Sequence, residues 1–267
     1  MAKVVLITGA SAGIGSACAA RLHEAGWVVV GTSRRGTSTG AWPGLVMDVD
    51  RDESVRDATA QVLARHGRID AVVASAGWGV AGAVEHTTID EAKAQVETNF
   101  WGATRVVQGV LPIMRAQGGG RIVLISSIGG VVAIPFQAFY SASKFALEGL
   151  GEALAYEVKP FGISVTLVEP GNVRTEFTAN RKVAAAAAGD DVYRSALGLA
   201  LGVMERDETN GASPDDVASV VEKVLDSRRP PRRVSVGKAG ERIGIVAKRL
   251  LPQRVFEAAA RSSLGVQ

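Results

Sequence analysis

The 267-residue sequence predicts an α/β fold: a single domain in which a doubly wound, mostly parallel seven-stranded sheet is flanked by helices. Short β-branched runs alternate with longer helical patterns from the first residues onward, which is typical of βαβ units and a buried parallel sheet. No change in composition and no Ser/Gly-rich linker divides the chain before residue 170. The 47% hydrophobic and 21% charged residues are ordinary for a globular protein and exclude a largely disordered chain.

Seven short apolar or β-branched runs are the predicted strands. They lie at Lys3–Thr8, Trp27–Thr32, Leu45–Val49, Ile69–Ala74, Arg121–Ser126, Ile163–Val168 and Arg233–Val236. Apolar residues recur at helical spacing over 14–25 and 55–63, which predicts helices packed on the sheet. Ser213 and Pro214 precede two aspartates, so a capping hydroxyl, a first-turn proline and two carboxylates predict a helix start there.

Two segments depart from this alternation. Residues 174–212 contain an alanine run and an apolar stretch, and they predict a mobile helical insertion. The second segment, about 230–267, is a basic C-terminal extension with an amphipathic pattern that Pro252 interrupts.

The basic charge of the chain is concentrated at this end. Residues 228–267 hold ten Arg/Lys and two Asp/Glu, a net +8, so the rest carries −5 of the overall +3. Such a patch could meet anionic lipid or nucleic acid, but no motif or interleaved aromatic residue accompanies it. We therefore expect no nucleic-acid partner and favour a solvated face, with peripheral membrane contact left open.

The cysteine, histidine and apolar content of the sequence argues against disulfide-bonded, secreted, membrane-spanning and metal-binding proteins. The single cysteine, Cys18, allows no intrachain disulfide and is typical of a reducing compartment, so a cytoplasmic location is expected. The amino-terminal apolar run is too short for a signal peptide, and no run of about 20 apolar residues predicts a membrane span. His23, His66 and His86 have no carboxylate or cysteine cluster at ligand spacing, so no metal site is expected.

A glycine-rich turn follows the first predicted strand and opens the first helix. Glycines allow a tight turn and leave the helix amino end, with its free N–H groups, facing a pyrophosphate. The predicted contacts of this turn with a dinucleotide are Gly9, Ser11, Gly13, Ile14 and Gly15. The alternative is a plain strand-to-helix turn.

The end of the second strand indicates which nucleotide would bind. Ser33, Arg34 and Arg35 stand where an NAD enzyme usually presents a carboxylate to the adenosine ribose. Guanidinium groups suit a 2′-phosphate because they can donate paired, charge-assisted hydrogen bonds. We therefore predict NADP(H), with NAD(H) second. Two solvated loop arginines are the alternative.

A second group of residues has side chains suited to proton transfer. Tyr140 and Lys144 are four residues apart, so on a helix both side chains project from one face. A nearby positive charge favours phenolate, and lowering a phenol pKa by two to three units takes roughly 3–4 kcal/mol. Ser127, thirteen residues earlier, could orient and polarise the same carbonyl oxygen. Alone, the Tyr-x-x-x-Lys pair is a weak signal and Ser127 could be a strand-end cap. Ser127 does not lie in a Gly-x-Ser-x-Gly motif, the mark of a serine nucleophile.

Taken together, these motifs resemble the short-chain dehydrogenase/reductase family over residues 3 to about 175, which implies a Rossmann fold. The matching positions, in the family's order, are Thr8–Gly15, Asp48, Val49, Asn99, Ser127, Tyr140, Lys144, Pro170 and Gly171. The resemblance implies that Asn99 holds a water chain to Lys144, that Asp48 meets the adenine amine and that Val49 lies beside the adenine. It also implies cofactor contacts from Tyr140 and Lys144 and from Ala76, Gly77, Pro170, Gly171, Val173 and Thr175. From the residues alone, Asn99 could cap a helix bend and Asp48 could be a turn residue.

Within the family, residues 76–79, 99–102 and 169–171 resemble the hydroxysteroid and retinol dehydrogenase branch, which implies a bulky apolar substrate. Ser75 stands where the family usually has asparagine, so the side-chain hydrogen bonding of that turn is in doubt. The resemblance also implies a homodimer or homotetramer, formed through the helices near 99–116 and 140–161. The insertion at 174–212 is then interpreted as a substrate lid.

The sequence thus predicts an NADP(H)-dependent oxidoreductase that transfers hydride between nicotinamide and a ketone or secondary alcohol. In this hypothesis Tyr140 donates the proton, Lys144 lowers its pKa and holds the nicotinamide ribose, Ser127 orients the oxygen and Asn99 supports proton resupply. The alternative is a non-catalytic NADP(H)-binding sensor or interaction protein that kept the nucleotide fold.

Overall fold

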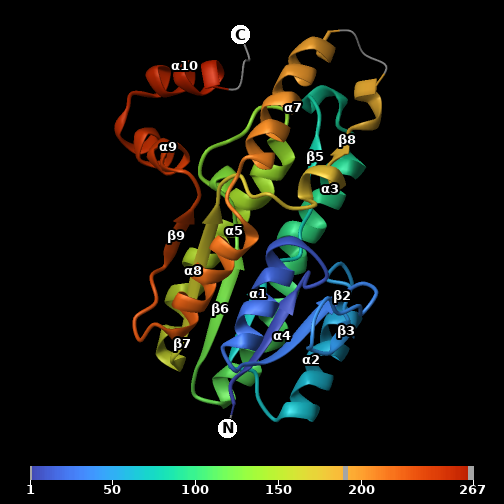
Figure 1. The fold of residues 1–267 in the computed structure, drawn as a ribbon, viewed down its shortest axis with the longest axis vertical. Coiled ribbons are helices and arrows are strands. Elements are labelled where there is room, and N and C mark those ends of the chain that lie inside the picture. The colour runs from blue at the N-terminus through green and yellow to red at the C-terminus, as the bar shows by residue number, and fades with distance from the viewer. Residues whose placement is uncertain (1, 189–191, 264–267) are drawn as a thin grey trace.

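A parallel sheet of seven strands forms the centre of the molecule (Figure 1). The structure, a computed structural model, describes residues 2–188 and 192–263. Residues 189–191 of the predicted insertion and 264–267 of the basic extension therefore lie outside the described residues.

The order of the strands creates a crevice at the middle of the sheet. Across the sheet they are β3 (Gly44–Val46), β2 (Val28–Ser33), β1 (Val4–Thr8), β4 (Ala71–Ala74), β6 (Gly120–Ile125), β7 (Ile163–Pro170) and β9 (Arg233–Val236). Every neighbouring pair is parallel. The chain builds outward from β1 to β3, then restarts beside β1 with β4 and builds the other way. Ligands of open α/β sheets bind at such a reversal point, beyond the carboxyl ends of the strands.

Helices cover both faces of the sheet because each strand sends alternate side chains to opposite sides. On β1, Val4 and Leu6 join one apolar cluster, while Val5 and Ile7 join the other. The first cluster packs against α2 (Asp52–His66), α4 (Ala103–Ala116) and α5 (Ala138–Glu157). The second packs against α1 (Gly13–Glu24) and α8 (Pro214–Asp226). These two cores confirm the predicted doubly wound fold.

The remaining elements are shorter or peripheral. They are β5 (Val80–Ala81), η1 (Val84–His86), α3 (Ile89–Val96), the π-helix η2 (Glu97–Gly102), η3 (Ile128–Gly130), η4 (Lys159–Phe161), α6 (Phe177–Asn180), β8 (Lys182–Val183), η5 (Ala185–Ala188), α7 (Arg194–Thr209), α9 (Ala239–Leu250) and α10 (Gln253–Ser263). In Figure 1, α7 stands beyond the carboxyl ends of the strands, while α9 and α10 extend away from the sheet.

Local chemistry explains where the elements begin and end. Ser213 and Asp216 form the reciprocal cap of α8, as the sequence predicts. The third strand is shorter than predicted and ends at Val46. The Met47 amide makes the last ladder bond, to the Ser33 carbonyl, and the Asp48 amide then donates to the Ser54 hydroxyl instead of continuing the ladder. Cys18 is fully buried in α1, and burial raises its pKa to about 12.

The insertion is more tightly attached than the sequence indicates. Besides its helices, it contributes β8, which pairs with β5 in a separate two-stranded sheet that the sequence does not predict. Two-residue strands are too short to show an alternating pattern. None of the helices in the described ranges combines the length and apolar character that crossing a bilayer requires.

Candidate active site

The glycine-rich turn after β1 is shaped by backbone contacts that leave no room for side chains. Gly9 has φ +68°, and a Cβ there would lie 3.0 Å from the Ala76 Cα. A Cβ on Gly15 would lie 2.3 Å from the carbonyl oxygen of Gly9. Ala12, at the N-cap of α1, has no polar side chain, so the first N–H groups of the helix are free of a side-chain cap. A narrow backbone cradle at a helix amino end fits the pyrophosphate of a dinucleotide.

The end of β4 closes the other side of this cradle. The Thr8 hydroxyl accepts hydrogen bonds from the amides of Ser75 (3.0 Å) and Ala76 (3.1 Å), which tie β4 to β1. Ser75 thus uses its backbone at this turn, where the shorter side chain had put the hydrogen bonding in doubt. A Cβ on Gly13 would lie 3.3 Å from Thr175. Thr175 therefore faces the predicted pyrophosphate turn from across the crevice.

Gly77 links the cradle to the proton-transfer residues. A Cβ on Gly77 would lie 3.1 Å from Asn99 Oδ1 and 3.9 Å from Lys144 Nζ. The fold therefore brings Gly9, Ala76, Gly77, Asn99 and Lys144 close to one another, although they are spread over 136 residue positions of the sequence.

Tyr140, Lys144 and Ser127 meet at the carboxyl end of β6. Tyr140 and Lys144 lie on consecutive turns of α5, with Lys144 Nζ 5.9 Å from the centroid of the Tyr140 ring. The Lys144 ammonium is buried and donates to the carbonyl oxygen of Ile125 at 2.8 Å. A Cβ on Gly129 would lie 3.2 Å from both Ser127 Oγ and Tyr140 Cε1, so the serine and phenol are neighbours. The arrangement can present a phenol and a hydroxyl to the same oxygen atom.

Burial opposes the charged forms of both groups. It raises the pKa of the Tyr140 phenol, against the lowering influence of a hydrogen bond with Ser127. It lowers the pKa of Lys144 to about 8, against the raising influence of Glu148. In the protein without a bound nucleotide, desolvation therefore outweighs the neighbouring charges at Tyr140. That Lys144 and an oxidised nicotinamide together lower the pKa of the phenol stays a prediction.

The Asn99 side chain is committed to protein partners. It lies in the π-helix η2, a local widening that often occurs at functional sites. Its Oδ1 accepts from the Trp78 amide at 3.0 Å, and its Nδ2 donates to the Trp78 carbonyl (3.0 Å) and to Ser143 Oγ (3.2 Å). Asn99 thus joins the loop after β4 to α5, one turn from Tyr140.

The predicted adenosine contacts lie at the end of β2 and beyond β3. Arg34 and Arg35 are exposed, and Ser33 accepts from the Thr37 amide at 3.2 Å. Asp48 is half-buried, and its carboxylate accepts from the Asp50 amide at 3.2 Å. Val49 is buried, and its side chain would contact a Cβ on Gly102.

The segment after β7 includes the other predicted contacts. Ser127 Oγ donates to the Pro170 carbonyl at 3.4 Å, which holds the end of β7 against the serine. The space beside Gly171 is taken by Glu241, whose carboxylate would lie 2.2 Å from a Cβ there. Val173 is buried and bridges to Ala212 at the end of the insertion. Gly171 is thus required by a close contact within the protein.

The family model for short chain dehydrogenases matches residues 3–185, more than half of the chain. The chain belongs to the short-chain dehydrogenase/reductase family. Its members are oxidoreductases, which supports an enzyme over the alternative of a non-catalytic sensor or interaction protein. Solved structures of this fold are complexed with NAD, with NADH or with a hydroxylated NADP, so the fold accommodates both kinds of nucleotide.

The sequences and structures similar to this short-chain dehydrogenase/reductase match most of its length. A 3-ketodihydrosphingosine reductase from Bacteroides thetaiotaomicron is 41% identical over 260 residues, 97% of each chain. Retinol dehydrogenase 8 from Bos taurus is 37% identical over 252 residues, 86% of this chain and 80% of the relative. The crystal structure of a short-chain dehydrogenase from Streptomyces avermitilis, 34% identical, superposes with a TM-score of 0.82 and covers 98% of both chains.

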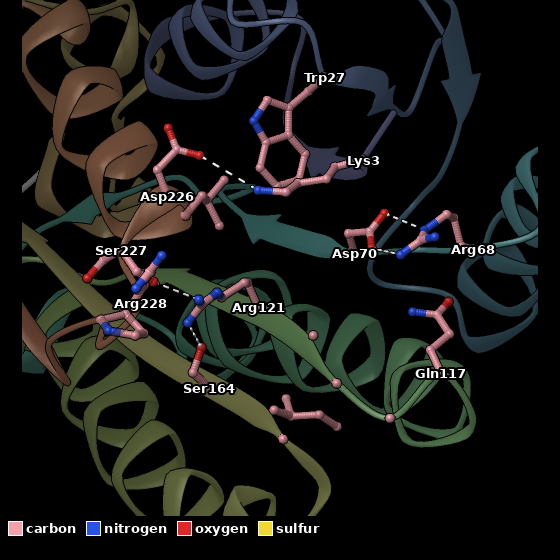
Figure 2. A pocket seen from close by; sticks show the side chains of 17 residues that line it. Lys3, Trp27, Arg68, Asp70, Gln117, Arg121, Ser164, Asp226, Ser227 and Arg228 are labelled. Atoms are coloured by element: carbon pink, nitrogen blue, oxygen red, sulfur yellow. Dashed lines mark hydrogen bonds and ion pairs between the residues drawn. The ribbon is translucent and has the colours of Figure 1, made fainter. Parts of the chain in front are cut away.

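One cavity of this short-chain dehydrogenase/reductase lies away from the site. It has a volume of about 670 Å³ and is lined by residues at the amino ends of the strands, among them Lys3, Asp70 and Arg121 (Figure 2). Its polar groups bond to one another: Arg68 pairs with Asp70, and Arg121 donates to Ser164 and to the Ser227 carbonyl. Within residues 2–188 and 192–263, no group of three or more His, Cys, Asp or Glu could hold a metal ion.

The sequence missed an ion pair whose charges act on Tyr140. Arg181 and Glu208 both lie in the insertion, and the charges of both act on the pKa of the Tyr140 phenol. The two residues are 27 positions apart in a segment without regular periodicity, so no sequence pattern predicts their pairing. Phe177, whose ring centroid lies 5.6 Å from that of Tyr140, was likewise missed.

Proposed function

We propose that this short-chain dehydrogenase/reductase transfers a hydride between NADP(H) and a ketone or secondary alcohol with a bulky apolar body. The observation that carries the proposal is the meeting of Tyr140, Ser127 and Lys144 beside the glycine cradle. The similarity to a reductase of a keto compound supports ketone reduction, and the similarity to a retinol dehydrogenase supports an apolar substrate.

Each residue of the site has a distinct part in the proposed reaction. Bound NADPH supplies the hydride to the carbonyl carbon. The Tyr140 phenol donates its proton to the carbonyl oxygen, and Ser127 hydrogen-bonds that oxygen and shares its developing charge. The Lys144 ammonium stabilises the resulting phenolate and holds the nicotinamide ribose. Asn99 supports proton resupply by fixing the loop at Trp78 against α5. In the oxidative direction Tyr140 acts as the base.

The remaining nucleotide contacts are proposed along the crevice. The turn residues Gly9, Ser11, Gly13, Ile14 and Gly15 hold the pyrophosphate at the amino end of α1. Asp48 and Val49 hold the adenine. The nicotinamide side is contacted by Ala76, Gly77, Pro170, Gly171, Val173 and Thr175.

NADP(H) is preferred over NAD(H) in this proposal because Arg34 and Arg35 follow β2 without a carboxylate beside them. Their exposure leaves both guanidinium groups accessible to a 2′-phosphate. In a fluorescence titration of the purified protein, NADPH should bind at least tenfold more tightly than NADH, and Arg34→Ala/Arg35→Ala should remove most of that difference. Equal or reversed affinities of the unaltered protein would contradict the assignment.

The insertion at 174–212 is proposed as the substrate lid. Ala184, Ala187 and Leu197 from the insertion form an apolar cluster with Val80, against which Trp78, Phe136 and Phe139 pack. This cluster joins the insertion to the loops around the site and supports an apolar substrate. These contacts support an insertion that lines the proposed substrate site and does not move freely.

Three proposals concern the whole protein. Self-association into a dimer or tetramer through the helical segments near 99–116 and 140–161 would cover the exposed rings of Trp101, Phe145 and Phe161. The basic C-terminal extension would contact anionic membranes through α9. A cytoplasmic location fits a single, fully buried cysteine.

The direct test is Tyr140→Phe. This variant keeps the ring and loses the transferable proton, so it should bind NADPH as the unaltered protein does and lose at least a hundredfold in kcat. The measurement is NADPH oxidation with a panel of steroid, retinoid, aromatic and aliphatic carbonyl compounds. Full activity of the variant would remove Tyr140 from the mechanism, and no turnover by the unaltered protein would favour the sensor alternative.

A further inference from the structure

A buried ion pair lies in the insertion, beside the ring of Phe177. Arg181 Nη2 donates to Glu208 Oε1, and the two side chains are only 3% and 11% exposed. The Thr178 hydroxyl donates to the other carboxylate oxygen of Glu208 at 2.6 Å. Both oxygens of the carboxylate are therefore satisfied, and the guanidinium is held in a fixed orientation.

Arg181 has donors that no protein atom uses. Its Nε and Nη1 are fully buried and have no hydrogen-bond acceptor among the residues that the structure describes. Leaving a buried donor of a charged group unsatisfied costs about 1–3 kcal/mol or more, so native structures rarely do so without a functional reason. These N–H groups are available to an acceptor that the protein itself does not provide.

The free donors belong to the same site as Tyr140. The Arg181 guanidinium carbon lies 5.9 Å from the centroid of the Phe177 ring, and that ring lies 5.6 Å from the ring of Tyr140. The charges of Arg181 and Glu208 also shift the pKa of the phenol, in opposite directions. Gln137, at the start of α5, donates to Met204 on α7 at 3.3 Å, which holds α7 over the helix that carries Tyr140.

The charge balance selects the kind of acceptor. Glu208 already neutralises Arg181, so a second anion would leave one negative charge in excess in a buried site, at a large desolvation cost. A neutral oxygen, by contrast, can accept hydrogen bonds from Nε and Nη1 and leave the pair neutral. A hydroxyl or a second carbonyl group has this chemistry.

We propose that Arg181 binds a neutral oxygen of the substrate, a hydroxyl or second carbonyl close to the reacting ketone, and that Glu208 positions the guanidinium for this contact. The inference rests on the proposed function and narrows it: the substrates are oxygenated ketones rather than plain apolar ones. Arg181 is a specificity-determining residue, and Glu208 is a positioning residue that acts through it.

The test compares matched ketones of equal chain length. The probes are 3-dodecanone, 1-hydroxy-3-dodecanone and the anion 3-oxododecanoate, with kcat/KM measured under saturating NADPH. We expect the hydroxyketone to be favoured over the plain ketone by about ten- to a hundredfold, as for a hydrogen bond to a charged donor. We expect the anion to have no such advantage.

The variants separate recognition from folding. Arg181→Met/Glu208→Gln removes both charges together, so neither charge is left buried without its partner. This variant should bring kcat/KM for the hydroxyketone down to about that for 3-dodecanone measured with the same variant, while NADPH affinity changes by less than about threefold. Arg206→Met, at an exposed arginine of the same insertion, should leave the preference unchanged. A merely structural role of the ion pair would instead lower activity on both ketones equally.

Three outcomes would overturn the inference. They are equal activity on the two neutral ketones, a preference that survives loss of Arg181, and a preference for the anion that depends on Arg181. In each of these cases ketone turnover would still uphold the proposed function, whereas no turnover on any ketone would contradict the proposed function itself.

Discussion

At the scale of single residues, the chemistry depends on charges that surround a desolvated phenol and ammonium. Glu148 is buried one turn after Lys144 on α5, and its charge raises the pKa of the lysine. Arg233 from β9 donates to Glu148 at 2.8 Å and to Glu152 at 2.6 Å, and it lies 3.7 Å from the buried Glu169. This network keeps negative charge near Lys144 and pairs it with the Arg233 guanidinium.

The pH dependence of carbonyl reduction should report this arrangement. The pKa of Lys144 is about 8, so its ammonium loses its proton as the pH rises through that value. Stabilisation of the phenolate is then lost, and kcat should fall above about pH 8. Glu148→Gln removes a charge that raises this pKa, so the fall should begin at lower pH.

Steady-state pH profiles with a single ketone would measure this shift. Glu152→Gln is the matched control, because Glu152 is half-exposed and shares Arg233 but does not act on Lys144. An unchanged profile for Glu148→Gln, or an equal shift for the control, would show that Lys144 does not set the alkaline limb.

At the scale of elements, two helices position the site in different ways. α5 is held tightly to the sheet: Gly151 faces Leu167 of β7, and a Cβ there would lie 2.9 Å from that leucine. α7 lies over the start of α5 and has two exposed glycines, Gly198 and Gly202, with open space beside them. The contact between α5 and the sheet is thus closely packed. The exposed face of α7, by contrast, carries two glycines, which have a low helix propensity.

Alanine substitutions should separate these two environments. Gly198→Ala adds a methyl group in open space within a helix and should stabilise the protein by about 0.5–1 kcal/mol. Gly151→Ala should destabilise it by roughly 1–3 kcal/mol, because the new methyl group overlaps Leu167 in a packed core. Denaturant unfolding of both variants would measure the two free energies. A stabilised Gly151→Ala would mean that the α5–β7 contact can relax.

At the scale of the whole molecule, charge and exposed apolar surface coincide at the C-terminal end. Ile243, Val246 and Leu250 are exposed at helical spacing on α9, within the segment of net charge +8. Lys248 of the same helix donates to the Val131 carbonyl in the loop after β6, the loop that leads from Ser127 to Tyr140. An apolar helix face among basic residues is typical of a helix that lies on an anionic bilayer.

Vesicle binding would test the proposed membrane contact. The full chain should sediment with vesicles of phosphatidylcholine and phosphatidylglycerol and not with phosphatidylcholine alone, and added salt should weaken the binding. Ile243→Asp/Leu250→Asp should abolish sedimentation. Val84→Asp, at an exposed apolar position outside this segment, should not. Equal recovery of all three proteins would contradict a role for α9.

How far the sequence predicts this protein differs between the fold and the site. The seven strands and their helices follow from alternating patterns, and the strand Arg233–Val236 was predicted with its observed bounds. The third strand was placed too far along the chain, because the hydrogen bonds of Asp48 with its neighbours override the apolar pattern. Among the site residues, Tyr140 and Lys144 could be paired from helical spacing alone. The roles of Asn99, Asp48 and Val49 came only from resemblance.

By itself, the sequence determined the order of strands and helices, the glycine turn and the spacing of phenol and amine, because these depend on local periodicity and backbone conformation. Only the tertiary structure decided that Arg181 and Glu208 meet beside Tyr140, and that burial raises the pKa of the phenol and lowers that of Lys144. Desolvation and long-range charge pairing depend on which surfaces come together when the chain folds, and no pattern along the chain encodes them residue by residue.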